Sequence, residues 1–471
     1  MSDDAKDTAY QAIVIGAGPG GYPCGIRLGQ LGVKTLVIER EYWGGVCLNV
    51  GCIPSKALIN ASHRYQELLH SDEMGFSIEG TVKLDTEKLQ TWKQTVVDKL
   101  TGGVRTLLKA NKVDMVFGAA KIVAKGTVEV ETKDGPKRFT ADHIVVATGS
   151  SPIEIPGFSF ADPPVLDSTK ALALSQIPKR VVVIGGGYIG LELGGVFNRL
   201  GSEVVVVEMM DQLLPGFDPE VVKVVERRMK KEGMTWHLKT KALGWEQADQ
   251  GIVVKVETPE GKVDLAADVV LVTVGRRPNS KGLGLEALGV EMNGPFVKID
   301  RQMKTNVPGI YAIGDVAGNP MLAHKATHEG EVVAEVIAGH DVQYDAKQVP
   351  AVVFIDPEVA TAGLTEPECK AKGLNYKVGK VPFAAIGKAI ANNATDGFVK
   401  VIIDADTKLI LGVTIVGNHA SDIISEAGLA IEMAAEALDV GLTIHPHPTL
   451  GESIMEAAKA AIGEAIHIVN R

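Results

Sequence analysis

The stretch AIVIGAGPGGYPCGIRLGQLGVKTLVIE, residues 12–39, decides the fold. It consists of an apolar strand, a turn that carries Gly16, Gly18 and Gly21, a helix-length segment and a second strand that ends in Glu39. Glycines in such a turn let backbone N–H groups approach a pyrophosphate at a helix N-terminus, and the terminal acid can accept a hydrogen bond from a ribose hydroxyl. The complete pattern predicts a dinucleotide-binding βαβ unit, whereas the glycines alone would fit any tight turn.

The pattern recurs at residues 180–208, where the strands RVVVIG and EVVVVE flank a second glycine-rich turn. The glycines of this turn are Gly185, Gly187 and Gly190. Two units predict two bound dinucleotides. An NADP site usually has Arg or Lys soon after the second strand, but Glu208 is followed here by two methionines and an aspartate. The second unit is therefore expected to bind NAD.

Two cysteines, Cys47 and Cys52, follow the first unit in the segment GGVCLNVGCIPSK, residues 44–56. They are too far apart for a CxxC motif. The other two of the four cysteines, Cys24 and Cys369, have no Cys or His at metal-ligand spacing, so a zinc site would lack ligands. We therefore expect a redox-active pair and no metal.

Composition narrows the class of protein. A chain of 471 residues is long enough for about three domains. The formal net charge of −10 argues against bulk attraction to nucleic acid or anionic membrane. The first ten residues, MSDDAKDTAY, have neither the apolar core nor the Arg-rich character of a targeting segment. We expect a cytoplasmic protein with no nucleic-acid or membrane partner, although a processed organellar chain would look the same.

Together these motifs resemble the dihydrolipoamide dehydrogenase family of flavin disulfide reductases, and the likeness extends to the C-terminus. The resemblance implies an α/β fold with two Rossmann-like dinucleotide-binding domains, one for FAD and one for NAD, plus a C-terminal α+β dimerisation domain. The expected limits are 1–150 for the FAD-binding domain, 151–280 for the NAD-binding domain, 281–349 for a central domain that completes the FAD site, and 350–471 for the interface domain.

The resemblance also implies roles for the cysteine pair and its neighbours. Cys47 would be the interchange thiol that meets substrate, and Cys52 the partner against the flavin, the two forming the redox disulfide. Lys56 lies one helical turn beyond Cys52 and matches the flavin-proximal lysine of the family, although a solvated surface lysine is the alternative. In the family this lysine pairs with a glutamate, which corresponds here to Glu192. Glu192 lies among apolar neighbours, so its carboxylate needs a cation if it is buried.

A second constellation, HPHPTLGE at residues 445–452, lies near the C-terminus. A neutral imidazole can accept a thiol proton near neutral pH, and a carboxylate fixes its tautomer. The family likeness identifies His447 and Glu452 as the acid–base pair rather than a chance His-rich turn. Because the family closes its site across a two-fold axis, we expect this pair to meet the cysteines of a second copy. Three residues depart from the commoner pattern of the family. Pro446, where Ala is commoner, is expected to shift the orientation of the pair slightly, whereas Val46, where many relatives have Thr, and Lys388, where Arg is frequent, have no mechanistic account.

Further positions are expected at the cofactors by the same resemblance. Asp315, in TNVPGIYAIGDVAG, would contact the ribityl chain of FAD, although it also fits a helix N-terminal acid. The other expected cofactor-binding positions are Gly16, Gly18, Gly21, Glu39, Arg40, Gly45, Val46, Lys56, Gly118, Ala120, Thr148, Gly149, Met321, Leu322, Ala323, His324, Gly185, Gly187, Tyr188, Ile189, Gly190, Glu208 and Gly275.

The implied activity is oxidation of dihydrolipoamide to lipoamide with NAD+ as acceptor, through the redox disulfide and FAD. The implied partners are a second copy of the chain, dihydrolipoamide borne on a lipoyl domain, and the acyltransferase core of a 2-oxo acid dehydrogenase complex or the lipoyl carrier protein of a glycine cleavage system.

Two alternatives remain. Glutathione, trypanothione and mercuric reductases share the Cys pair and the distal His–Glu pair, but they normally use NADPH, and the mercury enzymes usually add a C-terminal Cys pair that this chain lacks. A flavoprotein that only docks into a multienzyme core belongs to a different class. Retention of both cysteines, His447 and Glu452 argues against it.

Overall fold

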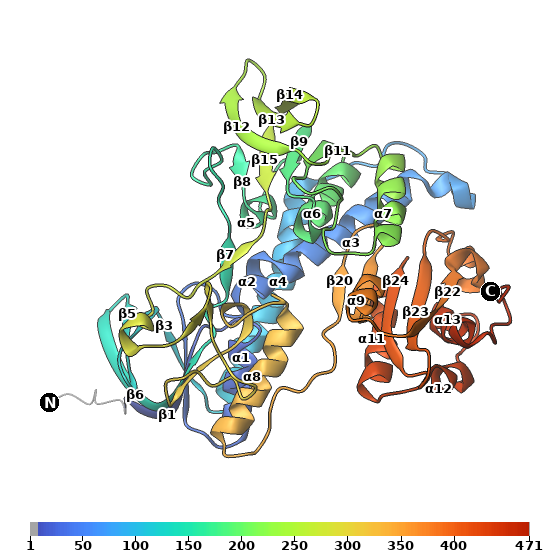
Figure 1. Cartoon of the computed structure of the whole chain (residues 1–471). Coiled ribbons are helices and arrows are strands. Elements are labelled where there is room, and N and C mark those ends of the chain that lie inside the picture. Colours follow the sequence, from blue (N-terminus) through green and yellow to red (C-terminus); the bar gives the residue numbers. More distant parts are fainter. Residues whose placement is uncertain (1–7, 471) are drawn as a thin grey trace.

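The computed structural model describes residues 8–470 (Figure 1). The first sheet, at lower left in Figure 1, is built on parallel strands in the order β3-β2-β1-β6. Strand β19 also pairs with β6 in parallel, although it follows the second sheet in the chain. The elements of this part are β1 (Ala9–Ile15), α1 (Gly21–Gln30), β2 (Thr35–Glu39), β3 (Asp114–Phe117), β4 (Ala119–Ala124), β5 (Thr127–Thr132), β6 (Gly135–Val146), β19 (Ile310–Ala312) and α8 (Ala323–Ile337).

The second sheet, at the top of Figure 1, is entirely parallel in the order β11-β10-β9-β15-β8. An antiparallel sheet, β12-β13-β14, extends from it. The elements are β8 (Val165–Leu166), α5 (Ser168–Ala171), β9 (Arg180–Ile184), α6 (Tyr188–Arg199), β10 (Glu203–Val207), α7 (Pro219–Lys231), β11 (Thr235–His237), β12 (Lys241–Gln247), β13 (Ile252–Thr258), β14 (Gly261–Ala267) and β15 (Val269–Val272). Strands β7 (Ser150–Pro152) and β16 (Arg276–Pro278) pair where the chain crosses between the two sheets.

The C-terminal part is α+β. Its antiparallel sheet has the order β20-β21-β24-β23-β22. The elements are β20 (Ala351–Val353), β21 (Val359–Gly363), α9 (Glu366–Ala371), β22 (Tyr376–Pro382), α10 (Gly387–Ala391), β23 (Phe398–Asp404), β24 (Ile410–Val416), α11 (Ala420–Glu432), α12 (Ala437–Leu442) and α13 (Glu452–Ile462). The chain therefore contains, in the predicted order, two nucleotide-binding folds and an α+β unit. The residue limits given for the domains remain predictions.

Burial explains why the nucleotide-binding strands are so apolar. Residues 12–15 of β1 and all of β2 are buried, as expected for parallel strands covered on both faces. Helices α2 (Gly45–Val50), α3 (Cys52–Leu69) and α4 (Thr86–Ala110) follow the first βα unit. Among residues 8–470 no helix has both the length and the apolar character needed to cross a bilayer.

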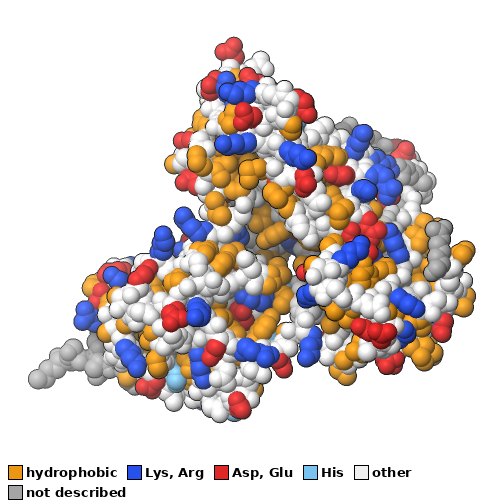
Figure 2. Space-filling model, in the orientation of Figure 1, with side chains coloured by type: hydrophobic (Ala, Val, Ile, Leu, Met, Phe, Trp, Pro, Cys, Tyr) orange, Lys and Arg blue, Asp and Glu red, His pale blue; other side chains and the backbone are white. Residues whose placement is uncertain are grey.

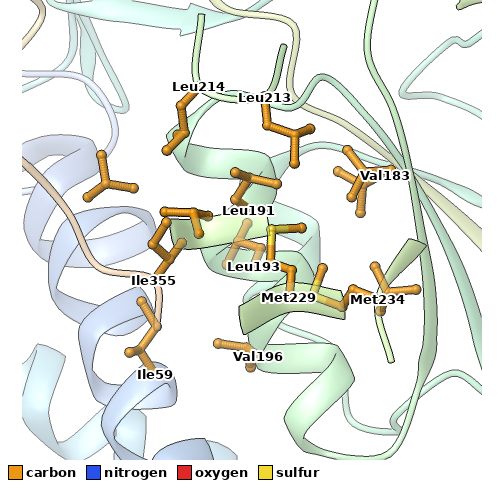
Figure 3. Close-up of a cluster of buried hydrophobic side chains, with 14 of the residues drawn as sticks. Ile59, Val183, Leu191, Leu193, Val196, Leu213, Leu214, Met229, Met234 and Ile355 are labelled. Carbon is orange, nitrogen blue, oxygen red and sulfur yellow. The ribbon is translucent and has the colours of Figure 1, made fainter. Parts of the chain in front are cut away.

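One apolar cluster joins all three parts (Figure 3). Ile59 comes from α3, Leu191 and Leu193 from α6, and Ile355 from the segment after β20. These side chains pack together and are each 7% exposed or less. Helix α3 is therefore fixed against the second sheet by hydrophobic burial, which places its N-terminus, and with it Cys52, at the boundary between the nucleotide-binding parts.

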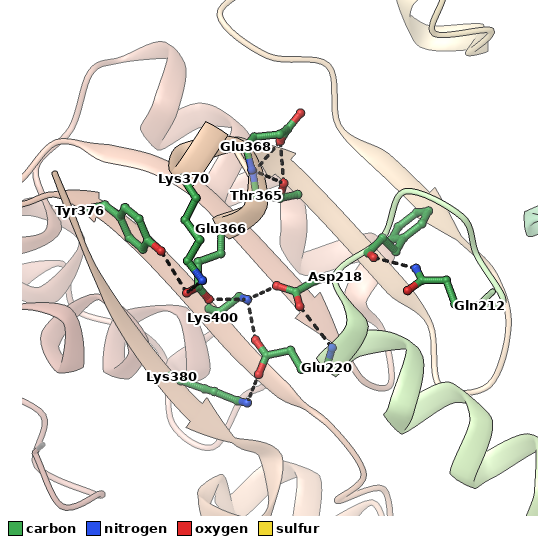
Figure 4. Close-up of polar contacts among 11 residues, drawn as sticks. Gln212, Asp218, Glu220, Thr365, Glu366, Glu368, Lys370, Tyr376, Lys380 and Lys400 are labelled. Atoms are coloured by element: carbon green, nitrogen blue, oxygen red, sulfur yellow. Dashed lines mark hydrogen bonds and ion pairs between the residues drawn. The ribbon is translucent and has the colours of Figure 1, made fainter. Parts of the chain in front are cut away.

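A buried lysine links the second sheet to the C-terminal part (Figure 4). Lys400, in β23, has a side chain 1% exposed, and its Nζ contacts Asp218, Glu220 at 2.5 Å and Glu366 at 3.4 Å. Burial opposes its charge, but the hydrogen bonds to Asp218 and Glu220 leave the pKa of Lys400 raised. The three carboxylates thus converge on an ammonium group.

We predict that Lys400→Met destabilises the protein by about 3–5 kcal/mol, because Asp218, whose side chain is 10% exposed, then loses its cation beside a buried apolar group. Lys370→Met is the matched control. Lys370 contacts the same Glu366 at 3.3 Å but its side chain is 68% exposed, so its loss should cost about 1 kcal/mol or less. Denaturant unfolding measures both variants, and equal stabilities would contradict this role of Lys400.

Candidate active site

A cavity of about 1050 Å³ lies between the two nucleotide-binding parts. In Figure 2 the surface is hollowed between the upper part and the lower-left part. The expected site residues that line the cavity are Gly16, Gly18, Glu39, Arg40, Gly45, Val46, Cys47, Cys52, Lys56, Gly118, Ala120, Thr148, Gly149, Tyr188, Ile189, Glu192, Asp315, Met321, Leu322, Ala323 and His324. One continuous hollow therefore holds the cysteine pair and most positions expected at FAD.

The first glycine turn packs closely against neighbouring backbone. Gly16 has φ +104°, and a Cβ on it would lie 2.3 Å from the Ala147 carbonyl oxygen. Gly45 has φ +62°, and its Cβ would lie 2.5 Å from the Gly18 Cα. Side chains are excluded at both points because backbone segments meet there. Gly16, Gly18 and Gly45 all line the cavity, so bare backbone forms part of its wall, which fits an extended dinucleotide such as FAD.

Glu39 organises this turn from the end of β2. Its Oε2 accepts from the Ala17 N–H at 2.7 Å, and its Oε1 accepts from the N–H groups of Arg40 and Glu41 at 2.9 and 2.8 Å. A carboxylate offers about four acceptor positions. Oε2 accepts only one of these backbone bonds, so it can still take a ribose hydroxyl, as the sequence predicts.

The second unit repeats this arrangement. Gly185 has φ +105°, and a Cβ on Gly190 would lie 2.2 Å from the Gly185 carbonyl oxygen. Glu208 accepts from the Gly186 N–H at 2.6 Å and from the Met210 N–H at 2.7 Å. Unlike Tyr188 and Ile189, the glycines and Glu208 lie outside the main cavity. The second glycine turn and Glu208 thus repeat the geometry of the first unit, as the predicted second dinucleotide site requires.

Cys47 and Cys52 are both free thiols, and they interact directly. Cys47 lies in α2 and Cys52 begins α3. The pKa of Cys47 is raised, first because its thiol donates a hydrogen bond to the Cys52 sulfur and then because it is buried. The pKa of Cys52 is lowered to about 7, chiefly by that hydrogen bond, with a further contribution from the charge of Lys56 against the opposing effect of burial. Cys52 is therefore the more acidic thiol of the pair.

Lys56 and Glu192 form the ion pair that the resemblance implies. Lys56 Nζ lies 2.7 Å from Glu192 Oε2, and the Glu192 side chain is 5% exposed. The other oxygen, Oε1, accepts from the Phe354 N–H at 2.9 Å, and the Phe354 ring lies 4.4 Å from Lys56 Nζ. The ring and the N–H come from the C-terminal part, so three parts of the chain hold this pair. Phe354 lies in no motif, so its role could not be predicted from the sequence.

His447 and Glu452 are paired but distant from the cavity of their own chain. His447 Nδ1 lies 2.9 Å from Glu452 Oε1, and the Thr449 N–H donates to Oε2 at 2.8 Å. These two partners lower the pKa of Glu452 against the opposing effect of burial. His447 is 78% exposed, and neither residue lines the cavity. A single chain does not bring the imidazole to the thiols.

Apolar side chains are exposed close to His447. Leu442 and Ile444, just before it in the chain, are 71% and 95% exposed, and Leu429 and Met433 on and after α11 are 65% and 72% exposed. A surface of this kind on a folded part indicates contact with another chain. His447 is thus positioned to be covered by a partner.

The comparisons with known proteins agree with this geometry. Residues 10–330 match the family described as Pyridine nucleotide-disulphide oxidoreductase, and residues 349–458 match its dimerisation domain. The chain therefore belongs to the pyridine nucleotide-disulphide oxidoreductases.

Within this family the chain is similar to proteins named dihydrolipoyl dehydrogenase. The protein of that name from Bacillus subtilis is 51% identical over 97% of both chains, and that from Geobacillus stearothermophilus is 49% identical over 100% of both. Among solved structures, LpdA from Mycobacterium tuberculosis is 26% identical with a TM-score of 0.89, over 95% of this chain and 99% of that one. The fold class and the enzyme class predicted from the motifs are confirmed, whereas the roles of single residues stay predictions.

We predict that alkylation of Cys52 by iodoacetamide in the reduced apoprotein rises with pH around a midpoint of about 7, because the thiolate is the reacting form. Lys56→Met should move this midpoint upward, since it removes a charge that favours the thiolate. Lys298→Met, which removes a surface lysine paired with Glu291, should leave it unchanged. Peptide mass spectrometry reads the site, and a wild-type midpoint near the ordinary thiol value of about 8.5 would contradict the assignment.

Proposed function

We propose that this chain is a dihydrolipoyl dehydrogenase, which oxidises dihydrolipoamide to lipoamide with FAD and NAD+ as cofactors. The observation that carries the proposal is the Cys47–Cys52 pair, which lies in the cavity between two dinucleotide-binding folds beside a lysine–glutamate pair whose carboxylate is buried. Relatives that bear this name are 46% to 51% identical to the chain over nearly its whole length.

The cysteine pair supplies the chemistry for one half of the reaction. In the oxidised protein the two sulfurs are bonded to each other. A substrate thiol loses its proton to a base, and the resulting thiolate attacks the sulfur of Cys47, so that the bond between the cysteines breaks and its electron pair goes to Cys52. The second substrate thiol then loses its proton and attacks the sulfur bound to Cys47. This closes the lipoamide ring and releases Cys47 as a thiol.

The environment of Cys52 favours these steps of disulfide exchange. A thiol of lower pKa leaves faster in disulfide exchange, and the pKa of Cys52 is lowered to about 7. Lys56, held by Glu192 at 2.7 Å, places a positive charge beside the newly formed thiolate. FAD, when bound, accepts the electron pair from the thiols and passes a hydride to NAD+. Gly16, Gly45 and Asp315 would hold it, with Lys56 near its ring system.

A second copy of the chain would supply the base. His447 accepts the substrate proton, and Glu452 fixes its tautomer and stabilises the imidazolium. The dimerisation domain matched at residues 349–458 supports a homodimer. The further partners proposed are a lipoyl domain that carries dihydrolipoamide and the core of a 2-oxo acid dehydrogenase complex or a glycine cleavage system, and the proposed location is the cytoplasm.

Activity of mixed dimers tests the proposal. The wild-type protein should reduce NAD+ with dihydrolipoamide, whereas Cys47→Ser and His447→Gln should each be nearly inactive. If one chain gives the cysteines and the other gives the imidazole, dimers refolded from an equal mixture of the two variants should regain activity. About half of the dimers are then hybrid, each with one intact site of two, so about a quarter of the wild-type activity should return.

Two outcomes would count against the proposal. A wild-type protein loaded with FAD that fails to oxidise dihydrolipoamide would refute the function itself. A mixture verified by mass spectrometry to contain hybrids, yet without regained turnover, would refute the shared site and leave the function standing. Each inactive variant refolded alone is the control.

A further inference from the structure

A short series of hydrogen bonds connects the NAD-binding part to Asp315. Arg276 lies in β16 and Ser150 in β7, the paired strands at the crossing between the two nucleotide-binding parts. Arg276 Nε donates to Ser150 Oγ at 2.7 Å, and Arg276 Nη2 donates to the Ser150 carbonyl oxygen at 2.6 Å. Ser150 Oγ in turn donates to Asp315 Oδ2 at 2.5 Å.

The direction of these bonds is fixed by chemistry. A guanidinium group only donates and a carboxylate only accepts, so the single hydroxyl proton of Ser150 must point to Asp315. The series starts at a cation and ends at an anion, and hydrogen bonds to charged groups are the stronger ones. Ser150 is 5% exposed, which shields both bonds from competing water.

These hydrogen bonds lie in the wall of the cavity, where they can affect ligand binding as well as local stability. Ser150, Arg276 and Asp315 all line the cavity between the two nucleotide-binding parts. Asp315 lies in a single 3-10 turn, Gly314–Val316, and has little else to fix its direction from its own element. A bond to Oδ2 sets how its carboxylate is turned toward the cavity.

We propose that Ser150 and Arg276 are positioning residues for FAD, which orient the Asp315 carboxylate so that it accepts hydrogen bonds from the ribityl hydroxyls. The inference rests on the proposed function, which supplies FAD and the role of Asp315. It implies that FAD binding depends on Arg276, which lies in β16, the strand through which the chain leaves the NAD-binding part.

Titration of the apoprotein with FAD, followed by flavin fluorescence, tests this inference without turnover. Ser150→Ala removes the hydroxyl that accepts from Arg276 and donates to Asp315, so the Asp315 carboxylate is no longer held toward the ribityl hydroxyls. The dissociation constant of FAD should therefore rise about 5-fold to 150-fold. Ser151→Ala is the matched control on the same strand. The Ser151 hydroxyl donates to Asn279 Oδ1 at 2.8 Å and not to Asp315, so its loss should change the constant by less than about twofold.

A double-mutant cycle separates positioning from general destabilisation. If Ser150 acts through Asp315, Ser150→Ala should cost almost nothing further in an Asp315→Ala background. Thermal unfolding of each apoprotein verifies that it is folded. The inference is overturned if Ser150→Ala binds FAD as tightly as wild type, or if the two losses multiply. A folded wild-type apoprotein that binds no FAD would instead overturn the proposed function on which the inference rests.

Discussion

The ion pair between Lys56 and the buried Glu192 is the interaction on which the rest of the site depends. Each member comes from a different nucleotide-binding part, and Phe354 adds a backbone N–H and an aromatic ring from the third part. A carboxylate as buried as Glu192 is costly without its cation, so α3 and α6 must meet at this point. Because Cys52 begins the helix that carries Lys56, the same constraint places the more acidic thiol in the cavity.

Elsewhere in the molecule, other polar contacts also fix distant segments of the chain against one another. Lys400 joins the C-terminal sheet to the start of α7 through Asp218 and Glu220, and Ser150 joins the crossing strands to Asp315. Both contacts are buried and both use charged groups, so they favour one relative placement of the parts over many. The Ser150–Asp315 contact lies in the cavity wall and helps to fix the shape of the cavity, while Lys400 fixes the C-terminal part against α7.

Local sequence pattern was sufficient for much of this site. The glycine turns, the cysteine pair and Lys56 each lie within a short segment whose spacing carries the chemistry, and the fold class followed from them. Phe354 and Ser150 could not be found in this way, since their roles arise from contacts 162 and 165 residues away in the chain. Lys400 shows the same limit, because its burial depends on Asp218, 182 residues away. His447 was recognised, but it lies outside the cavity of its own chain, and we infer that a second chain brings it to the cysteines.

We infer that reducing equivalents pass between NAD and the Cys47–Cys52 pair through the cavity. The most direct test of this transfer is differential alkylation of the FAD-loaded protein, without lipoamide and without oxygen, before and after addition of NADH or NADPH. We predict that Cys47 and Cys52 are protected as a disulfide at the start and that NADH makes both alkylatable. NADPH should do so far more slowly, because Glu208 repels its 2′-phosphate. Two thiols that are alkylatable from the outset and unchanged by NADH would contradict this transfer.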